Sequence, residues 1–180
     1  MNPGVPLAFL ADLADYPGPG FAAHLALWPQ ACAAASPVVH GLIADFAARS
    51  AALPPTQLEE LYAATFDLQP DCTLNLGHHL FGEDWKRSSL LIELASSMQR
   101  AGLELAGELP DHLCWLLRFL DRMPWTEESG ELTACILLPG VRALCAKLSQ
   151  DHLYQPLLHA LELRLADQPL ATASAAEATA

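Results

Sequence analysis

The chain has 180 residues, 52% of them hydrophobic, and its 9 Lys and Arg residues are outnumbered by 21 Asp and Glu residues, which gives a net charge of −12. This length suits one domain with a sizeable core. The acidic balance argues against nucleic acid and anionic membrane surfaces as partners, because both are bound through basic side chains. It is compatible with a basic peptide or a basic protein surface.

The amino-acid composition favours helices over strands, because Leu and Ala dominate and β-branched residues are few. The five cysteines are scattered and show no CxxC spacing, so they give little support to a disulfide framework or a zinc site. The N-terminal segment has no Lys or Arg before its short apolar stretch and therefore lacks the basic region of a secretory signal. The longest apolar stretch, near Ala134–Leu148, is interrupted by Pro139 and Gly140. We therefore expect a cytoplasmic protein without membrane insertion.

Hydrophobic periodicity in the first third of the chain predicts three helices, over Leu7–Asp15, Phe21–Ala35 and Val38–Leu53. The second should be shortened or kinked at Pro29. Thr56, followed three residues later by Glu59, predicts a capping box at the start of a fourth helix that ends near Asp67. A short helix is expected over Cys72–Leu80, ending at Gly82.

In the second half of the chain, Asp84 is a suitable N-cap for a helix with a core face of apolar residues and a C-terminal glycine at Gly102. The expected core residues of this helix are Leu90, Leu91, Leu94, Ala95 and Met98. Pro110 suits the first turn of the next helix, and Glu108 and Asp111 would place negative charge near its positive end. The buried stripe of that helix is predicted at Leu113, Leu116, Leu117 and Leu120.

The last third predicts a helix over Glu131–Leu148 with a kink at Pro139, and a final helix over Gln155–Ala166. No strand-type alternation and no internal repeat is visible. The fold class is therefore all-α, a single-domain bundle of seven to nine helices over residues 1–168, followed by a disordered Ala/Thr/Ser tail at 169–180.

Catalytic or metal-binding motifs are weak in this sequence. His78 and His79 are adjacent, so on a helix their side chains diverge by about 100° and do not readily share a metal ion. Asp111 and His112 are also neighbours and would not face each other on a helix, and no nucleophile elbow or glycine-rich phosphate loop accompanies them. The sequence therefore predicts no catalytic residue and no metal ligand.

Three short signatures lie between Leu58 and Leu120 in fixed order: LYAATFD (Leu61–Asp67), HHLFGEDWKR (His78–Arg87) and ELPDHL (Glu108–Leu113). At these signatures the chain resembles the NarJ branch of the molybdoenzyme assembly chaperones, also called the nitrate reductase delta subunit family. FLADLADYP at the start of the chain is similar to the family's opening helix.

The likeness is complete in some signatures and partial in one. Tyr62, Phe66 and Asp67 match the family's YxxxFD helix end, and Glu108–Leu113 matches ELPDHL in full. In the middle signature, His79, Gly82 and Arg87 match, whereas His78, Trp85 and Ser88 replace the usual Glu, Arg and Gly. The client implied is nitrate reductase or a relative, and a related selenate, chlorate or hydrocarbon-oxidising enzyme would fit the diverged signature.

The resemblance implies a helical bundle of the molybdoenzyme-chaperone type that is not an enzyme and acts in the cytoplasm. Its partner would be the apo catalytic subunit of a molybdenum oxidoreductase, bound through that subunit's N-terminal peptide. The chaperone would keep the client competent for complex assembly and for insertion of bis-molybdopterin guanine dinucleotide. The resemblance thus implies a cofactor that the client receives and that this chain does not hold stably.

The predicted client-binding residues are those that match or border the family motifs: Tyr62, Phe66, Asp67, His79, Gly82, Trp85, Arg87, Glu108, Pro110, Asp111 and His112. Acidic members, together with Glu83 and Asp84, would contact basic client residues, and aromatic members, with Leu113, would form an apolar floor. Each residue also has a structural interpretation: Phe66 and Leu113 as core, and Asp111 as a helix-terminus charge.

Two other functions stay open from the sequence. The aromatic and acidic loop residues would also suit a protein that binds a small ligand, the molybdenum cofactor or a guanine nucleotide. An enzyme that uses Asp111 and His112 is the third hypothesis.

Overall fold

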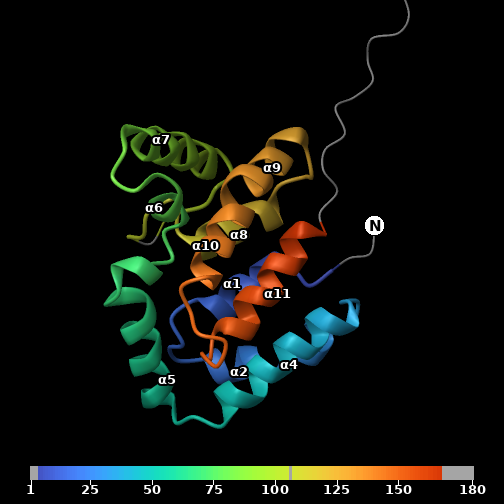
Figure 1. Cartoon of the computed structure of the whole chain (residues 1–180). Coiled ribbons are helices and arrows are strands. Elements are labelled where there is room, and N and C mark those ends of the chain that lie inside the picture. The colour runs from blue at the N-terminus through green and yellow to red at the C-terminus, as the bar shows by residue number, and fades with distance from the viewer. Residues whose placement is uncertain (1–3, 106, 168–180) are drawn as a thin grey trace, which may run out of the picture.

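The structure is a computed structural model that describes residues 4–105 and 107–167. Within these residues the fold is all-α (Figure 1). Its first half contains α1 (Leu7–Ala14), α2 (Phe21–Leu25), α3 (Trp28–Ala31), α4 (Pro37–Ala51), α5 (Pro55–Tyr62), α6 (Leu76–Phe81) and α7 (Trp85–Arg100). The second half contains α8 (Leu113–Arg122), α9 (Glu127–Leu132), α10 (Leu138–Cys145) and α11 (Gln155–Ala166). Three short turns complete the order: η1 (Ala63–Asp67) and η3 (Thr133–Leu137) are π-helical, and η2 (Pro70–Cys72) is a 3-10 turn.

Five helices make the centre of the bundle. Helix α8 packs against α1, and α11 packs against α4 and α10, so segments from both ends of the chain lie side by side (Figure 1). Helix α8 places six buried side chains on the core, five of them bulky and apolar, as its leucine spacing predicts. Helix α1 is buried on almost every side, and Asp121 of α8 caps its first turn by accepting a hydrogen bond from the Leu7 amide at 2.8 Å.

Several predicted elements are confirmed. The last helix spans the expected Gln155–Ala166, and α1 and α4 agree with their predicted segments to within two residues. Asp84 caps α7 by accepting from the Lys86 amide at 2.9 Å, and Gly102 follows that helix with φ +70°. Leu94 and Met98 are buried as predicted, whereas the other three expected core residues of α7 are only partly covered.

Other elements differ from the prediction. The expected helix over Phe21–Ala35 is two short helices, because the chain turns at Ala26–Leu27 before Pro29 takes a place in the first turn of α3. Helix α5 begins at Pro55 without a side-chain cap, so the capping box at Thr56 is wrong. A proline in the first turn fixes φ and needs no amide partner, which removes the need for that cap.

Three boundaries were also wrong. The short helix expected from Cys72 begins only at Leu76, and α8 begins at Leu113, so Pro110 lies before its first turn. The kinked helix predicted over Glu131–Leu148 begins earlier, at Glu127, and runs without a break through α9, η3 and α10. The regular α-helical hydrogen bonding is interrupted by the π-helical turn η3 just before Pro139. This turn accommodates the proline, which has no amide hydrogen to donate.

Among the described residues, none of the helices has the length and apolarity required to cross a membrane. The tail predicted at 169–180 lies outside the described residues.

Candidate functional site

A single pair of backbone hydrogen bonds joins two loops that are far apart in the sequence. The Leu76 amide donates to the Asp111 carbonyl at 2.9 Å, and the Leu113 amide donates to the Leu74 carbonyl at 2.8 Å. These bonds make an isolated antiparallel bridge between Asn75 and His112. In such a pair the two side chains project on the same side at close range. The bridge therefore brings the start of α6 and the end of the Glu108–Leu113 signature together.

A cleft of about 450 Å³ opens beside this bridge, and residues from four separate segments line it. Its lining comprises Asp15, Tyr16, Tyr62, Phe66, Asp67, Thr73, Leu74, Asn75, Glu108 and His112. Two of the sequence signatures, Leu61–Asp67 and Glu108–Leu113, thus meet at one place. Five predicted residues lie at this cleft: Tyr62, Phe66, Asp67, Glu108 and His112.

The first of these signatures reaches the cleft through the π-helical turn η1. Its Thr65 hydroxyl donates to the Leu61 carbonyl at 2.6 Å and lies 3.1 Å from Nε2 of His152. Because the hydroxyl proton is used on Leu61, Nε2 of His152 is the donor to Thr65. Single π-helical turns are rare in proteins, but those that occur are often found at functional sites. This one ends α5 with Asp67 exposed at the cleft.

Aromatic rings form one wall of the cleft. Tyr16 is 50% exposed and packs edge-to-face on Tyr62, with ring centroids 5.5 Å apart. Tyr62 packs on Phe66 in the same way at 5.1 Å, and Phe66 continues the chain of rings to Tyr154 in the core. The wall therefore begins at an exposed ring and is anchored in the hydrophobic core.

The carboxylates at the cleft fall into two kinds. Asp15 is paired, because Nη2 of Arg118 donates to it at 2.7 Å, and the same nitrogen donates to Asp12 at 2.8 Å. Asp67 and Glu108 are exposed, and neither has an ion-pair partner among the described residues. The cleft therefore carries uncompensated negative charge at its rim.

The floor of the cleft contains two polar groups without partners. His112 is 9% exposed and its Nδ1 has no hydrogen-bond partner, and Oδ1 of Asn75 is likewise buried without one. Burial lowers the pKa of His112, and the nearby carboxylates of Glu108 and Asp15 offset only part of this effect. At neutral pH the imidazole is therefore uncharged and retains one acceptor nitrogen.

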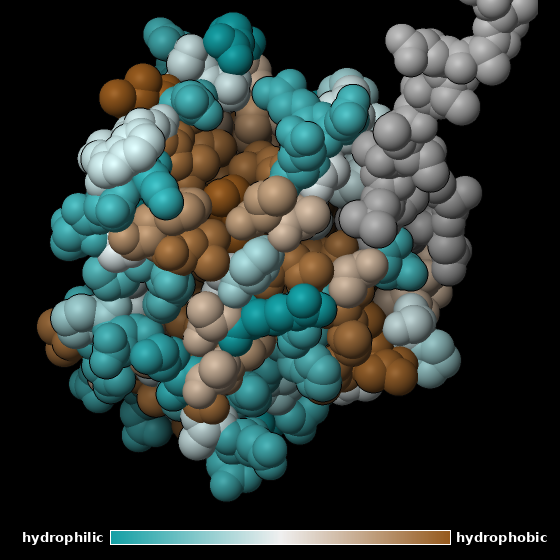
Figure 2. All heavy atoms as spheres, turned by 45° about the horizontal axis from the view of Figure 1, so that its top comes forward, coloured by the Kyte–Doolittle hydropathy of each residue, from teal (hydrophilic) through white to brown (hydrophobic). Residues whose placement is uncertain are grey.

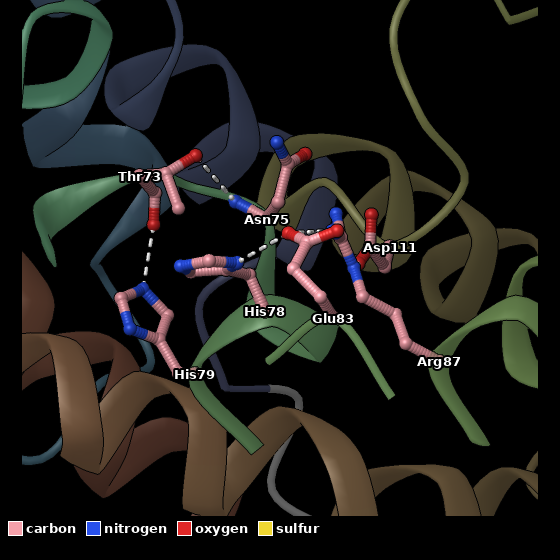
Figure 3. A network of polar contacts seen from close by, with 7 residues as sticks. All are labelled: Thr73, Asn75, His78, His79, Glu83, Arg87 and Asp111. Carbon is pink, nitrogen blue, oxygen red and sulfur yellow. Dashed lines mark hydrogen bonds and ion pairs between the residues drawn. The ribbon is translucent and has the colours of Figure 1, made fainter. Parts of the chain in front are cut away.

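Behind the cleft lies a buried polar network that fixes the Glu108–Leu113 loop (Figure 3). Nε of Arg87 donates to Oδ2 of Asp111 at 2.9 Å, and the Asp111 side chain has no exposed surface. Glu83 lies on the solvent side, 3.7 Å from Nη1 of Arg87 and 3.5 Å from Nδ1 of His78. Gly77 provides the space, because a Cβ there would lie 2.5 Å from Oδ2 of Asp111.

The second part of the network holds α6 in place. Nε2 of His79 donates to the Thr73 carbonyl at 2.7 Å, and the Thr73 hydroxyl accepts from the Asn75 amide at 3.3 Å (Figure 3). Burial lowers the pKa of His79, so the neutral ring with its proton on Nε2 is the favoured form. Gly82 ends the helix with φ +58°, a conformation that favours glycine.

The structure therefore separates the predicted residues into three groups. Tyr62, Phe66, Asp67, Glu108 and His112 line the cleft. The second group has structural contacts and is buried or partly buried: His79, Arg87, Pro110 and Asp111, together with Gly82, which ends α6. Trp85 is 71% exposed at the start of α7 and does not line the cleft. Asp111 and Leu113 have no exposed surface in this conformation, so any effect they have on a partner must be indirect. The client-binding role of each residue stays a prediction.

Sequence reasoning missed the other half of the cleft, namely Asp15, Tyr16, Thr73, Leu74 and Asn75. Asp15 and Tyr16 lie in the FLADLADYP segment, which resembles the family's opening helix, and that resemblance was the available signal. Asn75 had none, because its place depends on the long-range bridge to His112.

A second surface is an apolar groove of about 770 Å³ between α7, the end of α8, α9 and η3. Leu90, Leu94, Phe119, Leu132 and Ile136 contribute apolar side chains to it. Charged residues, namely Glu93, Arg100, Glu128 and Glu131, also line it. Figure 2 shows a hydrophobic hollow bordered by hydrophilic residues on the face that carries these helices. Hollows of this kind on a monomer are typical of protein-interaction sites.

Two kinds of site considered from the sequence, a metal site and an Asp111–His112 dyad, can be compared with the described part of the chain. Three or more His, Cys, Asp or Glu side chains do not converge there in a way that would hold a metal ion. Asp111 is turned toward Arg87, and Nδ1 of His112 has no partner, so the two neighbours do not form a hydrogen-bonded dyad. The described residues therefore contain neither a metal cluster of this kind nor an Asp111–His112 dyad.

Comparison with known proteins agrees with the geometry. The sequence profile of the nitrate reductase delta subunit family matches residues 25–155, which include the whole segment with the three signatures. The chain belongs to this family. It is 29% identical over 126 residues to the nitrate reductase molybdenum cofactor assembly chaperone NarJ of Escherichia coli strain K12, and equally to that of Escherichia coli O157:H7. The match covers 69% of this chain and 52% of each relative, so the chain spans about half the length of the curated relatives it matches.

Proposed function

We propose that this protein is a cytoplasmic, system-specific chaperone for a molybdenum oxidoreductase. It binds the apo catalytic subunit, mainly through that subunit's N-terminal peptide, and keeps it competent for cofactor insertion and complex assembly. The family membership supports the class of function, and the names of the NarJ relatives state molybdenum cofactor assembly for those proteins.

The observation that carries the proposal is the cleft where the Leu61–Asp67 and Glu108–Leu113 signatures meet. Its exposed rim is acidic and its wall is aromatic, a combination suited to basic and apolar side chains of a protein partner. The apolar groove beside α7 offers a second surface for a peptide that presents one hydrophobic face.

The same charges disfavour the small-ligand alternative at this cleft. Bis-molybdopterin guanine dinucleotide and guanine nucleotides carry phosphates, and phosphates are bound by basic side chains or clustered amide groups. The cleft instead has exposed Asp67 and Glu108. We therefore propose that the client receives the cofactor and that this chain holds none stably.

We further propose that the protein has no enzymatic activity of its own. Asp111, the natural candidate for a general base, is fully buried against Arg87 and is not accessible to a substrate. The middle signature departs from the family pattern at His78, Trp85 and Ser88, so we propose that it sets the selectivity for the client, which is nitrate reductase or a relative. Trp85, exposed at the start of α7, is a candidate for this selectivity.

Capture from cells tests the proposal. The full chain, with an affinity tag, is used to capture a molybdopterin-type catalytic subunit made in three forms: without cofactor, with cofactor, and without its N-terminal segment. We expect strong capture of the cofactor-free form and weak capture of the other two. If neither the cofactor-free subunit nor its N-terminal peptide binds, for the subunit encoded beside this gene and for its superfamily relatives, the proposal is wrong.

A further inference from the structure

A further hollow, which we name the α2–α4–α5 pocket, has a volume of about 660 Å³. Its walls are the turn at residues 17–20, α2, the end of α4 and the start of α5, and it shares no described lining residue with the cleft. The family profile begins to match at residue 25, so the turn and most of α2 lie outside the match. Sites for small molecules have volumes of about 300–1,000 Å³, so this pocket has the size of such a site.

The walls of the pocket are fixed by local hydrogen bonds and by prolines. The Phe21 amide donates to the Gly18 carbonyl at 3.0 Å, which closes the turn that leads into α2. Across the pocket, the Leu58 amide donates to the Pro54 carbonyl at 3.1 Å in the first turn of α5. Prolines contribute to the lining from both sides, and each has a fixed φ. A pocket with such walls loses little conformational entropy when a ligand enters it.

Most of the lining is apolar. Phe21, Leu25 and Trp28 contribute side chains from α2 and α3, and Leu53 and Leu58 contribute them from the other side. Aliphatic and aromatic side chains of this kind cover the apolar body of a ligand, and the two aromatic residues favour a body that contains a ring. The lining therefore predicts a ligand whose bulk is hydrophobic.

Two polar residues interrupt the apolar lining. Ser50 is 3% exposed, and its hydroxyl has no hydrogen-bond partner among the described residues. Glu59 supplies a partly exposed carboxylate that forms no ion pair within the described part of the chain. The neighbouring phenol of Tyr16 does not offset this charge, because desolvation and the carboxylate of Glu59 raise its pKa and keep it neutral. The pocket thus offers one free hydroxyl and one negative charge.

The charge of the lining decides the class of ligand. Neither lysine nor arginine is among the described residues that line the pocket, so a phosphate or carboxylate ligand would lack a counter-charge there. One carboxylate gives too few ligands for a bare metal ion. An ammonium group on an apolar body would pair with Glu59. A second polar group on that body would give the Ser50 hydroxyl the partner it lacks, which removes the free-energy cost of leaving it buried and unpaired.

We propose that the α2–α4–α5 pocket binds a small organic amine with a ring-containing apolar body, whose ammonium group pairs with Glu59 and whose second polar group bonds to Ser50. This assignment does not depend on the proposed function, because the pocket shares no described lining residue with the cleft or with the groove beside α7. It places a ligand site on α5, the helix that also carries Tyr62 of the cleft.

Three probes with one skeleton test the charge of the ligand. Tryptamine, tryptophol and indole-3-propionate share an indole ring and a two-carbon chain, which ends in an ammonium, a hydroxyl and a carboxylate group respectively. The backbone amide NMR signals of Ala22, Ser50 and Leu58, which line the pocket, are followed during each titration. We expect tryptamine to shift them and to bind at least about threefold more tightly than tryptophol and tenfold more tightly than indole-3-propionate. Equal affinity of either analogue would overturn the assignment to an amine, and shifts confined to other residues would overturn the site.

Neighbouring carboxylates on α5 separate the pocket from the general acidity of the surface. Glu59→Gln removes the charge that lines the pocket, and Glu60→Gln removes an exposed charge that does not. The preference for tryptamine over tryptophol should disappear in the first variant and should change by less than about twofold in the second. A preference that survives Glu59→Gln would mean that another group binds the ammonium.

Neighbouring alanines on α2 test the position of the site. Ala22 lines the pocket and Ala23 does not, and both are exposed, so a larger side chain is accommodated at either position without entering the core. Ala22→Phe should fill the pocket and weaken tryptamine binding at least about tenfold, whereas Ala23→Phe should change it less than about twofold. Equal effects of the two substitutions would overturn the site.

The role of Ser50 is tested by removing its hydroxyl. Ser50→Ala should leave the urea midpoint of the free protein unchanged or higher, since a buried hydroxyl without a partner is lost. The same variant should bind tryptamine at least about threefold more weakly, because the indole N–H loses its acceptor. A lowered midpoint, or unchanged tryptamine binding, would mean that Ser50 does not serve the ligand.

Capture of the cofactor-free subunit distinguishes this site from the proposed function. Ala22→Phe should capture the subunit as the wild type does. If it loses capture, and no probe binds to the wild type, the pocket is a docking surface for the partner protein and the amine site is wrong. If the wild type captures no subunit, the proposed function fails, while the titrations still decide whether the pocket binds an amine.

Discussion

The Glu108–Leu113 signature is divided between two regions that use acidic residues in opposite ways. At the cleft, Glu108 is exposed and unpaired among the described residues, whereas three positions later Asp111 is completely buried and bonded to Arg87. The backbone bridge between Asn75 and His112 is the boundary between them. One region holds the loop in place and the other faces the surface, so substitutions in one short motif should have different consequences for stability and for binding.

The largest expected effect is on the buried network. Arg87→Ala leaves Asp111 as an uncompensated buried charge, and removing one partner of a buried pair costs about 3–5 kcal/mol of unfolding free energy. Urea unfolding measures this loss. The control is Glu83→Gln, which removes an exposed partner of the same arginine and should change stability by less than about 1 kcal/mol.

A double substitution distinguishes a lost charge pair from lost packing. Arg87→Met with Asp111→Leu removes both charges and should recover most of the stability lost in Arg87→Ala, since apolar replacement of a whole buried pair is often neutral. If Arg87→Ala unfolds with wild-type stability, Asp111 is not held as described.

The second effect concerns glycines inside helices. Gly77→Ala should destabilise by about 1–3 kcal/mol, because the new methyl group would lie 2.5 Å from Oδ2 of Asp111 in a packed site. Gly41→Ala in α4 is the matched control, since no atom lies within 4 Å of its added Cβ and alanine favours the helix. There we expect a gain of about 0.5–1 kcal/mol. Thermal or urea unfolding of the two variants should therefore move in opposite directions.

The third effect is a dependence of stability on pH. Burial lowers the pKa values of His79, His112 and His152 below the ordinary 6.5. As the pH falls below 6.5, the unfolded chain binds protons that the folded protein does not, so the unfolding free energy decreases until the folded-state pKa values are passed. Above that pH these groups contribute no slope. Urea unfolding between pH 7.5 and 5.5 measures the slope, and His112→Gln should reduce it; an unchanged slope would mean that His112 has its ordinary pKa.

The smallest effect on stability is expected at the cleft. Asp67→Asn and Glu108→Gln remove exposed charges without partners in the described structure, so the unfolding free energy should change by less than about 0.5 kcal/mol. A melting temperature near that of the wild type checks this. A large loss in either variant would mean that the rim carboxylates hold the fold, and the contrast between the two regions would disappear.

The helices were predictable where their signals are local. Hydrophobic spacing determined α8 and α11, Asp84 caps α7 as its position predicted, and Gly102 follows with positive φ. The misplaced capping box at Thr56 was also a local inference, and it failed because Pro55 opens the helix by a different local mechanism. The π-helical turns η1 and η3 have no comparable sequence signal, because an extra residue in a turn is stabilised by tertiary packing.

The sequence by itself determined an acidic, all-α chain, and its signatures identified half of the residues that line the cleft. Only the tertiary structure decided which acidic residues are exposed and which are buried. Asp111 is fixed by Arg87, 24 positions away, and His112 is joined to Asn75 across 37 positions. Residue type and local spacing cannot distinguish a free carboxylate from a paired one, because the difference lies in which distant donor the packed core brings within hydrogen-bonding distance.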